Sequence, residues 1–195
     1  MTFRTAATAV ITLSAVLTVG ACTGSSEEST TPSVDTSSET SADFNEADVM
    51  FASMMIVHHE QAIEMSDIVL NQEGVDPRVT SLAEDIKAAQ TPEIEQLRSW
   101  LEAWGVGPGE LQMDDMGHGG GMMSEDELTA LEEADGPEAT HLFLEQMIVH
   151  HEGAVDMAET QVDQGSNPDA IELAQTIIDA QTAEIEEMRG LLASS

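Results

Sequence analysis

The chain has 195 residues, enough for one folded domain with a hydrophobic core, and a formal net charge of −33. Its 38 acidic residues, against five basic ones, would repel a phosphate backbone, which excludes a nucleic-acid-binding function. The single cysteine excludes an intrachain disulfide and a cluster of thiolate metal ligands. The same acidity favours solubility and attracts cations to the protein surface.

The N-terminal part has the composition of an export signal followed by a tether. Residues 1–21 contain one arginine and an apolar run too short for a membrane span, which is typical of a signal peptide. The segment Val19-Gly20-Ala21-Cys22 reads as a lipobox, so Cys22 is expected to carry a lipid that anchors the protein to the outer face of the membrane. The alternative is an unused thiol in an ordinary cleavage region. Residues 22–42 are rich in Ser, Thr and Glu, which predicts a disordered tether.

Residues 43–195 are expected to form an all-α, four-helix bundle made of two duplicated hairpins. Their apolar residues recur at three- and four-residue steps, which is the helical period, and no segment alternates as a β-strand does. We expect repeat one over 43–105, a Met- and His-rich connector over 106–137 and repeat two over 138–195.

Capping residues predict where several helices begin and end. Asp76-Pro77 and Asn167-Pro168 each supply an N-cap followed by a first-turn proline, at the start of the second helix of each hairpin. Ser124 to Glu127 has the form of a capping box and predicts a short extra helix within the connector. Gly136-Pro137 is expected to interrupt the chain before repeat two.

The clearest sign of duplication is a segment that contains two adjacent histidines. Phe51 to Met65 returns 92 positions later (143 − 51) as Phe143 to Met157. The first histidine of each pair lies in the middle of the apolar stripe of its helix, and the second is expected to turn toward the flank. The two pairs are His58–His59 and His150–His151.

The partner helices also carry polar residues on their apolar stripes. Gln90 and Gln181 lie among isoleucines, and Glu93 and Glu184 follow three residues later. Packing of the four helices would therefore bring imidazoles and amides into one layer, with these carboxylates within reach. Such a layer is a candidate ligand site, but buried imidazoles and amides can also satisfy one another and set the register of a bundle without any ligand. Both interpretations stay open at this stage.

The connector contains a second candidate site. Between residues 113 and 123 it has four methionines and one histidine among glycines, too irregular a pattern for core packing on a helix. Thioether and imidazole donors suit Cu(I), and glycines would let the loop wrap around an ion. The alternative is a flexible linker with incidental methionines. The residues are Met113, Met116, His118, Met122 and Met123.

At these residues the chain resembles a family of secreted bacterial proteins known as domain of unknown function three hundred and five. The hallmarks are the motif M-I-x-H-H-x-x-A-[IV]-x-M, found at Met55 to Met65 and at Met147 to Met157, and Q-T-x-E-I, found at Gln90 to Ile94 and at Gln181 to Ile185. The resemblance implies a ferritin-like bundle, and one member of the family is a periplasmic copper-binding protein. The chain has Gln-x-x-Glu where ferritin-like di-iron enzymes have Glu-x-x-His, which argues against an oxygen-activating di-iron centre.

The sequence therefore predicts an extracytoplasmic, lipid-anchored metal-binding protein, with copper as the expected ion and other divalent metals as alternatives. A ferritin-like metal-dependent oxidoreductase and a non-catalytic envelope interaction module with structural histidines are the competing hypotheses. The pattern indicates no particular reaction and no oligomeric state. The candidate metal ligands are His58, His59, His150, His151, Met55, Met147, Met113, Met116, His118, Met122 and Met123. The side chains expected to orient them are Gln90, Glu93, Gln181 and Glu184.

Overall fold

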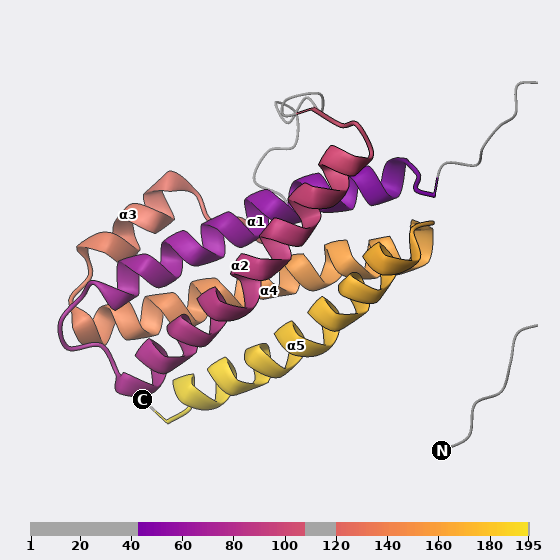
Figure 1. Ribbon diagram of the computed structural model, residues 1–195. Helices are drawn as coiled ribbons and strands as arrows, with labels where there is room; N and C mark the ends of the chain where they lie inside the picture. Colours follow the sequence, from indigo (N-terminus) through magenta and orange to yellow (C-terminus); the bar gives the residue numbers. More distant parts are fainter. Residues whose placement is uncertain (1–42, 108–119, 195) are drawn as a thin grey trace, which may run out of the picture. The chain divides into compact units, whose positions relative to one another are not determined.

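The computed structural model describes residues 43–107 and 120–194, and the regular elements in these two stretches are all helices (Figure 1). The long helices are α1 (Glu46–Leu70), α2 (Pro77–Ala103), α4 (Gly136–Gln164) and α5 (Pro168–Leu192), and the short one is α3 (Glu125–Glu133). Extensive contacts join α1 to α2 and α4 to α5, and the contact between α1 and α4 joins these two hairpins. The predicted all-α, ferritin-like bundle of two hairpins is confirmed.

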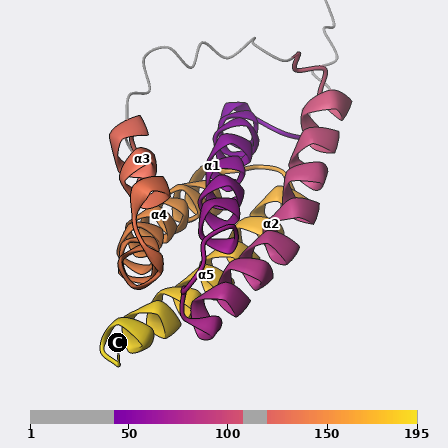
Figure 2. The ribbon, with the colours of Figure 1, turned by 90° about the vertical axis from the view of Figure 1, so that its left-hand side faces the viewer.

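The short helix α3 lies outside the bundle of four. It contacts α1 and α4, and Figure 2 shows it on the side of α1 opposite to α2. Within the described residues, no helix combines the length and the hydrophobicity that a membrane span requires.

Each helix begins at a side chain that accepts a hydrogen bond from the first turn. These N-caps are Asn45, Asp76, Ser124, Asp135 and Asn167.

The predicted break between the short helix and repeat two is present, but it lies at Ala134 and Asp135 and not at Gly136-Pro137. Asp135 caps α4, and Pro137 lies in the first turn, where its missing N–H would have had no helical partner in any case. The helix therefore begins at Gly136, ahead of the expected start at residue 138.

Two apolar clusters fill the bundle, one toward each end of α1 and α4. Met55 and Ala154 belong to one cluster, and Ala62 and Met147 belong to the other; all four are fully buried. Burial of a side chain as large as methionine contributes roughly 1.5–3 kcal/mol. The paired histidines lie between these positions on both helices, so a polar layer separates the two clusters.

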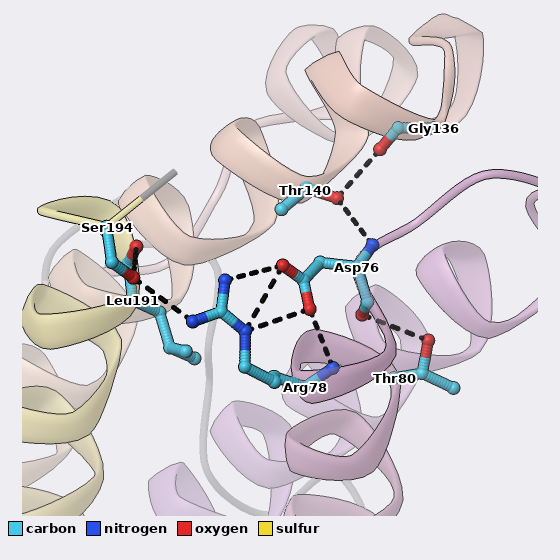
Figure 3. A network of polar contacts seen from close by, with 7 residues as sticks. All are labelled: Asp76, Arg78, Thr80, Gly136, Thr140, Leu191 and Ser194. Atoms are coloured by element: carbon cyan, nitrogen blue, oxygen red, sulfur yellow. Dashed lines mark hydrogen bonds and ion pairs between the residues drawn. The ribbon is translucent and has the colours of Figure 1, made fainter.

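Each hairpin is held at its turn by the first helix of the other hairpin. The buried Asp48 carboxylate of α1 accepts hydrogen bonds of 3.1 Å from the backbone N–H groups of Ser166 and Asn167, between α4 and α5. At the opposite end, the Thr140 hydroxyl of α4 accepts a hydrogen bond of 3.1 Å from the backbone N–H of Asp76, between α1 and α2 (Figure 3). Thr140 stands 92 positions after Asp48 (140 − 48), so the two contacts are related by the duplication.

The Asp76 end is closed further by an ion pair on the surface. The Arg78 guanidinium donates to the Asp76 carboxylate, at 2.6 Å for the shortest contact, and also donates to the Ser194 hydroxyl at 3.1 Å (Figure 3). The hydrogen bonds from Arg78 lower the pKa of Asp76 to about 2. The start of α2 is thereby joined to the end of α5.

Candidate metal centre

The central feature of the site is a pair of imidazoles that meet across the seam between the hairpins. His58 of α1 and His150 of α4 are 2% and 0% exposed, and their ring centroids are 3.7 Å apart with the planes tilted by 37°. Each lies one helical turn after a fully buried methionine, Met55 or Met147. Imidazoles from both halves of the molecule therefore converge inside the bundle.

The ring nitrogens of this pair are largely without hydrogen-bond partners. His58 Nε2 lies 2.8 Å from the Gly120 carbonyl oxygen. A carbonyl can only accept, so Nε2 carries the proton and the lone pair of a neutral His58 is on Nδ1. That Nδ1, and both ring nitrogens of His150, are buried and have no partner among the described residues. Such atoms are costly to bury unless something binds them.

The second histidine of each pair, predicted to turn toward the flank of the apolar stripe, is also fully buried. His59 donates from Nε2 to the Glu93 carboxylate of α2 at 2.7 Å, and His151 does the same to Glu184 of α5, also at 2.7 Å. Each carboxylate orients its ring, as carboxylates do for metal-bound histidines, and in a neutral ring the lone pair is then on Nδ1. Both Nδ1 atoms are buried and unpartnered within the described chain.

Two buried amides from the outer helices share this property. Gln90 of α2 and Gln181 of α5 are 3% and 4% exposed, and the side-chain oxygen of each has no partner in the described part of the protein. Of the ten buried side-chain nitrogens and oxygens that lack a partner there, seven belong to the four histidines and these two glutamines. Unpartnered polar atoms are thus concentrated in one layer of the molecule.

Burial keeps the central imidazoles neutral. Desolvation lowers the pKa of His58 from 6.5 to about 3, although the hydrogen bond to the Gly120 carbonyl acts in the opposite direction. Desolvation, and then the neighbouring His58, hold the pKa of His150 well below its ordinary value. Neutral imidazole is the form that binds a metal ion.

Residues 120–123 of the connector, called the connector end below, reach this layer. Two residues that we did not predict hold them there. The Gln61 amide of α1 donates to the Met123 carbonyl at 2.8 Å and accepts from the Met123 N–H at 2.7 Å. On α4, a Cβ at Gly153 would overlap the Gly120 carbonyl, so only glycine lets the backbones approach so closely. Gly120 itself has φ +75°, a conformation that favours glycine. An alignment of the two repeats could have pointed to these residues, because Gln61 and Gly153 occupy equivalent positions and differ.

The remaining candidates divide by location. Met122 is half-buried and Met123 is 7% exposed, both at the connector end just described. Met113, Met116, His118 and the predicted lipid-bearing Cys22 lie outside the described residues. Across residues 43–107 and 120–194, no three His, Cys, Asp or Glu side chains are grouped as a complete metal site. The central pair would therefore need methionine or connector ligands to complete a coordination sphere.

These features define a class of protein: a helical bundle of duplicated hairpins with a candidate metal centre between them. The chain belongs to the family described as Domain of unknown function (DUF305), whose family model matches residues 48–192. The family resemblance drawn from the paired histidines is therefore confirmed.

Solved structures of this family share the fold. A DUF305 fragment from Deinococcus radiodurans has a TM-score of 0.71 and 33% identity, and the match covers 77% of this chain and 98% of that one. A DUF305 protein from Streptomyces coelicolor, assigned as secreted, has a TM-score of 0.69 and 35% identity, with coverage of 76% and 91%.

CopM is similar over the same region. Its Cu(I)-bound form has a TM-score of 0.63 and 30% identity, with coverage of 75% of this chain and 96% of CopM. The Cu(II)-bound form has a TM-score of 0.64, and an Ag-bound form one of 0.62. No curated protein matches the chain.

Proposed function

We propose that this protein is an extracytoplasmic, lipid-anchored protein that sequesters or buffers copper through histidine and methionine ligands. The observation that carries the proposal is the layer of buried, unpartnered imidazole nitrogens between the two hairpins. The Cu(I)-, Cu(II)- and Ag-bound forms of CopM support it, because CopM is a relative with the same fold. The relative assigned as secreted supports the extracytoplasmic location.

The donor set fits a soft or borderline ion. His58 and His150 offer uncharged nitrogens, and the Glu93 and Glu184 carboxylates would hold the rings of His59 and His151 in place. Imidazole together with thioether suits copper, above all Cu(I), although imidazole also binds other divalent metals. Methionine and connector ligands would come from Met55, Met147, Met113, Met116, His118, Met122 and Met123.

A titration with Cu(I) under reducing conditions, in competition with a coloured Cu(I) chelator, tests the proposed ligands. We expect the variant in which His58, His59, His150 and His151 are all replaced by Gln to lose at least one equivalent of high-affinity copper. The matched control is His141→Gln, which removes an exposed histidine of the same helix as His150 and should leave the titration unchanged. Unchanged copper binding in the fourfold variant would contradict histidine ligation.

The competing explanation is that the histidine layer serves only to set the register of the bundle, since it lies between the two apolar clusters. A ligand of the folded state raises its stability by about 2.7 kcal/mol at a hundredfold excess over Kd. Adding Ag(I) to the metal-free protein should therefore raise Tm, by roughly 5–10 °C for a domain of this size. A Tm that Ag(I) leaves unchanged in wild type would favour the structural explanation.

Attachment to the membrane is proposed through a lipid on Cys22. The full chain expressed in a bacterium with lipoprotein processing should partition with membranes, and a Cys22→Ser variant should not. Mass spectrometry of the mature N-terminus should show a diacylglycerol on the cysteine. Mature wild-type protein without that added mass would contradict the anchor and would leave the copper proposal untouched.

A further inference from the structure

Helix α3 covers one half of the seam between α1 and α4. Its Leu131 is fully buried, and the Gln72 amide of α1 donates to the Leu131 carbonyl at 2.7 Å. The Gln146 amide of α4 donates to the Glu127 carbonyl at 3.0 Å. An apolar contact and two hydrogen bonds from side-chain amides to backbone carbonyls therefore hold α3 on this half of the seam.

Among residues 43–107 and 120–194, no helix covers the other half of the same seam. A hollow of about 430 Å³ lies between the first turns of α1 and the last turns of α4. With the repeat offset of 92, its walls are the counterparts of the residues beneath α3: Met50 and Met54 correspond to Leu142 and Gln146 (142 − 50, 146 − 54). The residues that matter for its chemistry are Glu46, Met50, Met54, Met157, Gln161 and Gln164. We call this hollow the methionine groove.

The methionine groove keeps one of the two amides that hold α3, because Gln164 corresponds to Gln72 (164 − 72), and has lost the other. Met54 stands at the position equivalent to Gln146, whose amide binds α3. Gln161 stands at the position equivalent to Val69, a residue of the apolar cluster. In exchange the groove presents thioethers from two helices. Met50 and Met54 are one turn apart on α1, and Met157 faces them from α4. Met50 is 46% exposed, so the groove is open to solvent.

Gln161 supplies a second, independent sign of a ligand. Its side chain is 1% exposed and lines the groove. The amide nitrogen donates to the Asp48 carboxylate at 2.6 Å, which fixes the orientation of the amide. The amide oxygen is buried and has no partner within residues 43–107 and 120–194. An unpaired acceptor beside thioethers, with the Glu46 carboxylate among the lining residues, attracts a cation.

We propose that the methionine groove is a separate binding site for a soft monovalent cation of the Cu(I) or Ag(I) type. The ligands are the thioethers of Met50, Met54 and Met157, and the Gln161 amide oxygen is the neighbouring acceptor. Thioethers bind soft ions and discriminate against Mg²⁺ and Ca²⁺, which prefer oxygen. None of these residues belongs to the proposed histidine centre, and the site rests on the proposed function only for the choice of metal.

The groove adjoins the histidine layer. The Met157 sulfur lies 3.8 Å from the position that a Cβ of Gly120 would occupy, and the Gly120 carbonyl accepts the hydrogen bond from His58. One residue of backbone therefore lies between the groove and the central imidazoles. A soft ion held in the groove would be next to the proposed copper ligands, where it could pass to them.

Titration with Ag(I), followed by NMR of the full mature chain labelled with ¹³C at the methionine ε-methyl groups, tests the site. The ε-methyl signals of Met50, Met54 and Met157 should shift together before one equivalent of Ag(I) has been added beyond the histidine sites. The Met50→Leu/Met54→Leu/Met157→Leu variant should bind one equivalent less. Met65→Leu/Met188→Leu replaces two fully buried core methionines at small cost and should keep the wild-type stoichiometry.

The same titration in the fourfold His→Gln variant separates this site from the proposed function. Groove methyl signals that still respond there support an independent site, whatever the histidines do. Groove signals that stay unmoved in wild type overturn the site, even if the fourfold variant loses copper at the histidine layer. If the triple Leu variant instead changes only its elution volume in size-exclusion chromatography, the groove is a surface for self-association and the metal site is overturned.

Discussion

The two hairpins repeat the same buried layer of histidines and differ where they meet the rest of the chain. Both carry a pair of buried histidines with a carboxylate from the partner helix, at 2.7 Å in each case. At the equivalent positions 61 and 153, however, one hairpin has a glutamine that binds the connector backbone and the other has a glycine that makes room for it. The connector end therefore lies against both hairpins by two different means.

The same contrast holds along the seam between α1 and α4. One half is covered by α3, and the other is the methionine groove. The repeats differ at buried positions as well as on their outer faces, since Gln161 corresponds to Val69 and Asp48 to Thr140, and all four are buried. Changing one half at a time should show what each difference does.

The largest single effect is expected at Asp48, which holds one turn as Thr140 holds the other. Asp48→Ala leaves the buried N–H groups around the second turn without their charged acceptor and should cost about 3 kcal/mol. Thr140→Val removes one neutral acceptor and should cost about 1 kcal/mol. Urea unfolding curves of the two variants measure both values. Equal losses would show that the turn contacts do not differ in strength.

The next contrast concerns pH and the central histidines in the metal-free protein. The pKa of His58 is about 3 when folded and 6.5 ordinarily, so the folded state binds fewer protons than the unfolded state. The contribution of His58 to the free energy of unfolding is complete above pH 6.5 and is lost as pH falls toward 3. Between pH 6.5 and 4.5 the loss amounts to roughly 2–3 kcal/mol. As pH is lowered, the free energy of unfolding of wild type should therefore decrease more steeply than that of His58→Gln.

Urea unfolding in the presence of a chelator, at several pH values, gives this difference in slope. Neutralisation of the acidic surface acts on both proteins alike, so the comparison with His58→Gln removes it. His150→Gln should flatten the profile in the same direction, because burial also lowers the pKa of His150. Parallel profiles for wild type and both variants would mean that these rings are not held neutral by burial.

Smaller individual effects, of opposite sign, are expected for two helical glycines. Gly153→Ala places a methyl group against the Gly120 backbone and should destabilise the protein by about 1–3 kcal/mol, with displacement of the connector end. Gly190→Ala on α5 meets nothing within 4 Å and should stabilise it by about 0.5–1 kcal/mol, because alanine favours a helix. Thermal unfolding measures both, and stabilisation by Gly153→Ala would show that the connector is not packed there.

The smallest effect is expected for a pair of ion pairs that the duplication repeats. Arg98 pairs with Glu60, and Arg189 pairs with Glu152; all four side chains are largely exposed. Exposed ion pairs contribute about 0–1 kcal/mol and are screened by salt. Arg98→Ala and Arg189→Ala should each change the free energy of unfolding by less than about 1 kcal/mol. A much larger change for one of the two would reveal an asymmetry that the structure does not show.

The helices, their duplication and the central position of His58 and His150 could be predicted from the sequence alone. Helical period, N-caps and repeat spacing are local properties, and each is legible within a few turns of chain. The burial of His59 was not predictable in the same way. Its direction on α1 points to a flank, and only the close approach of α2 with Glu93 turns that flank into interior.

The tertiary structure also decided where the connector end lies and which half of the α1–α4 seam is covered by α3. Gln61 and Gly153 are far apart in sequence, and only the packed bundle brings both to the same stretch of connector. Periodicity states which face of a helix is apolar, but the partner of that face depends on side chains from distant helices interlocking at short range. For that reason the sequence determined the bundle and its histidines, while the folded molecule determined which buried polar atoms lack a partner among the described residues.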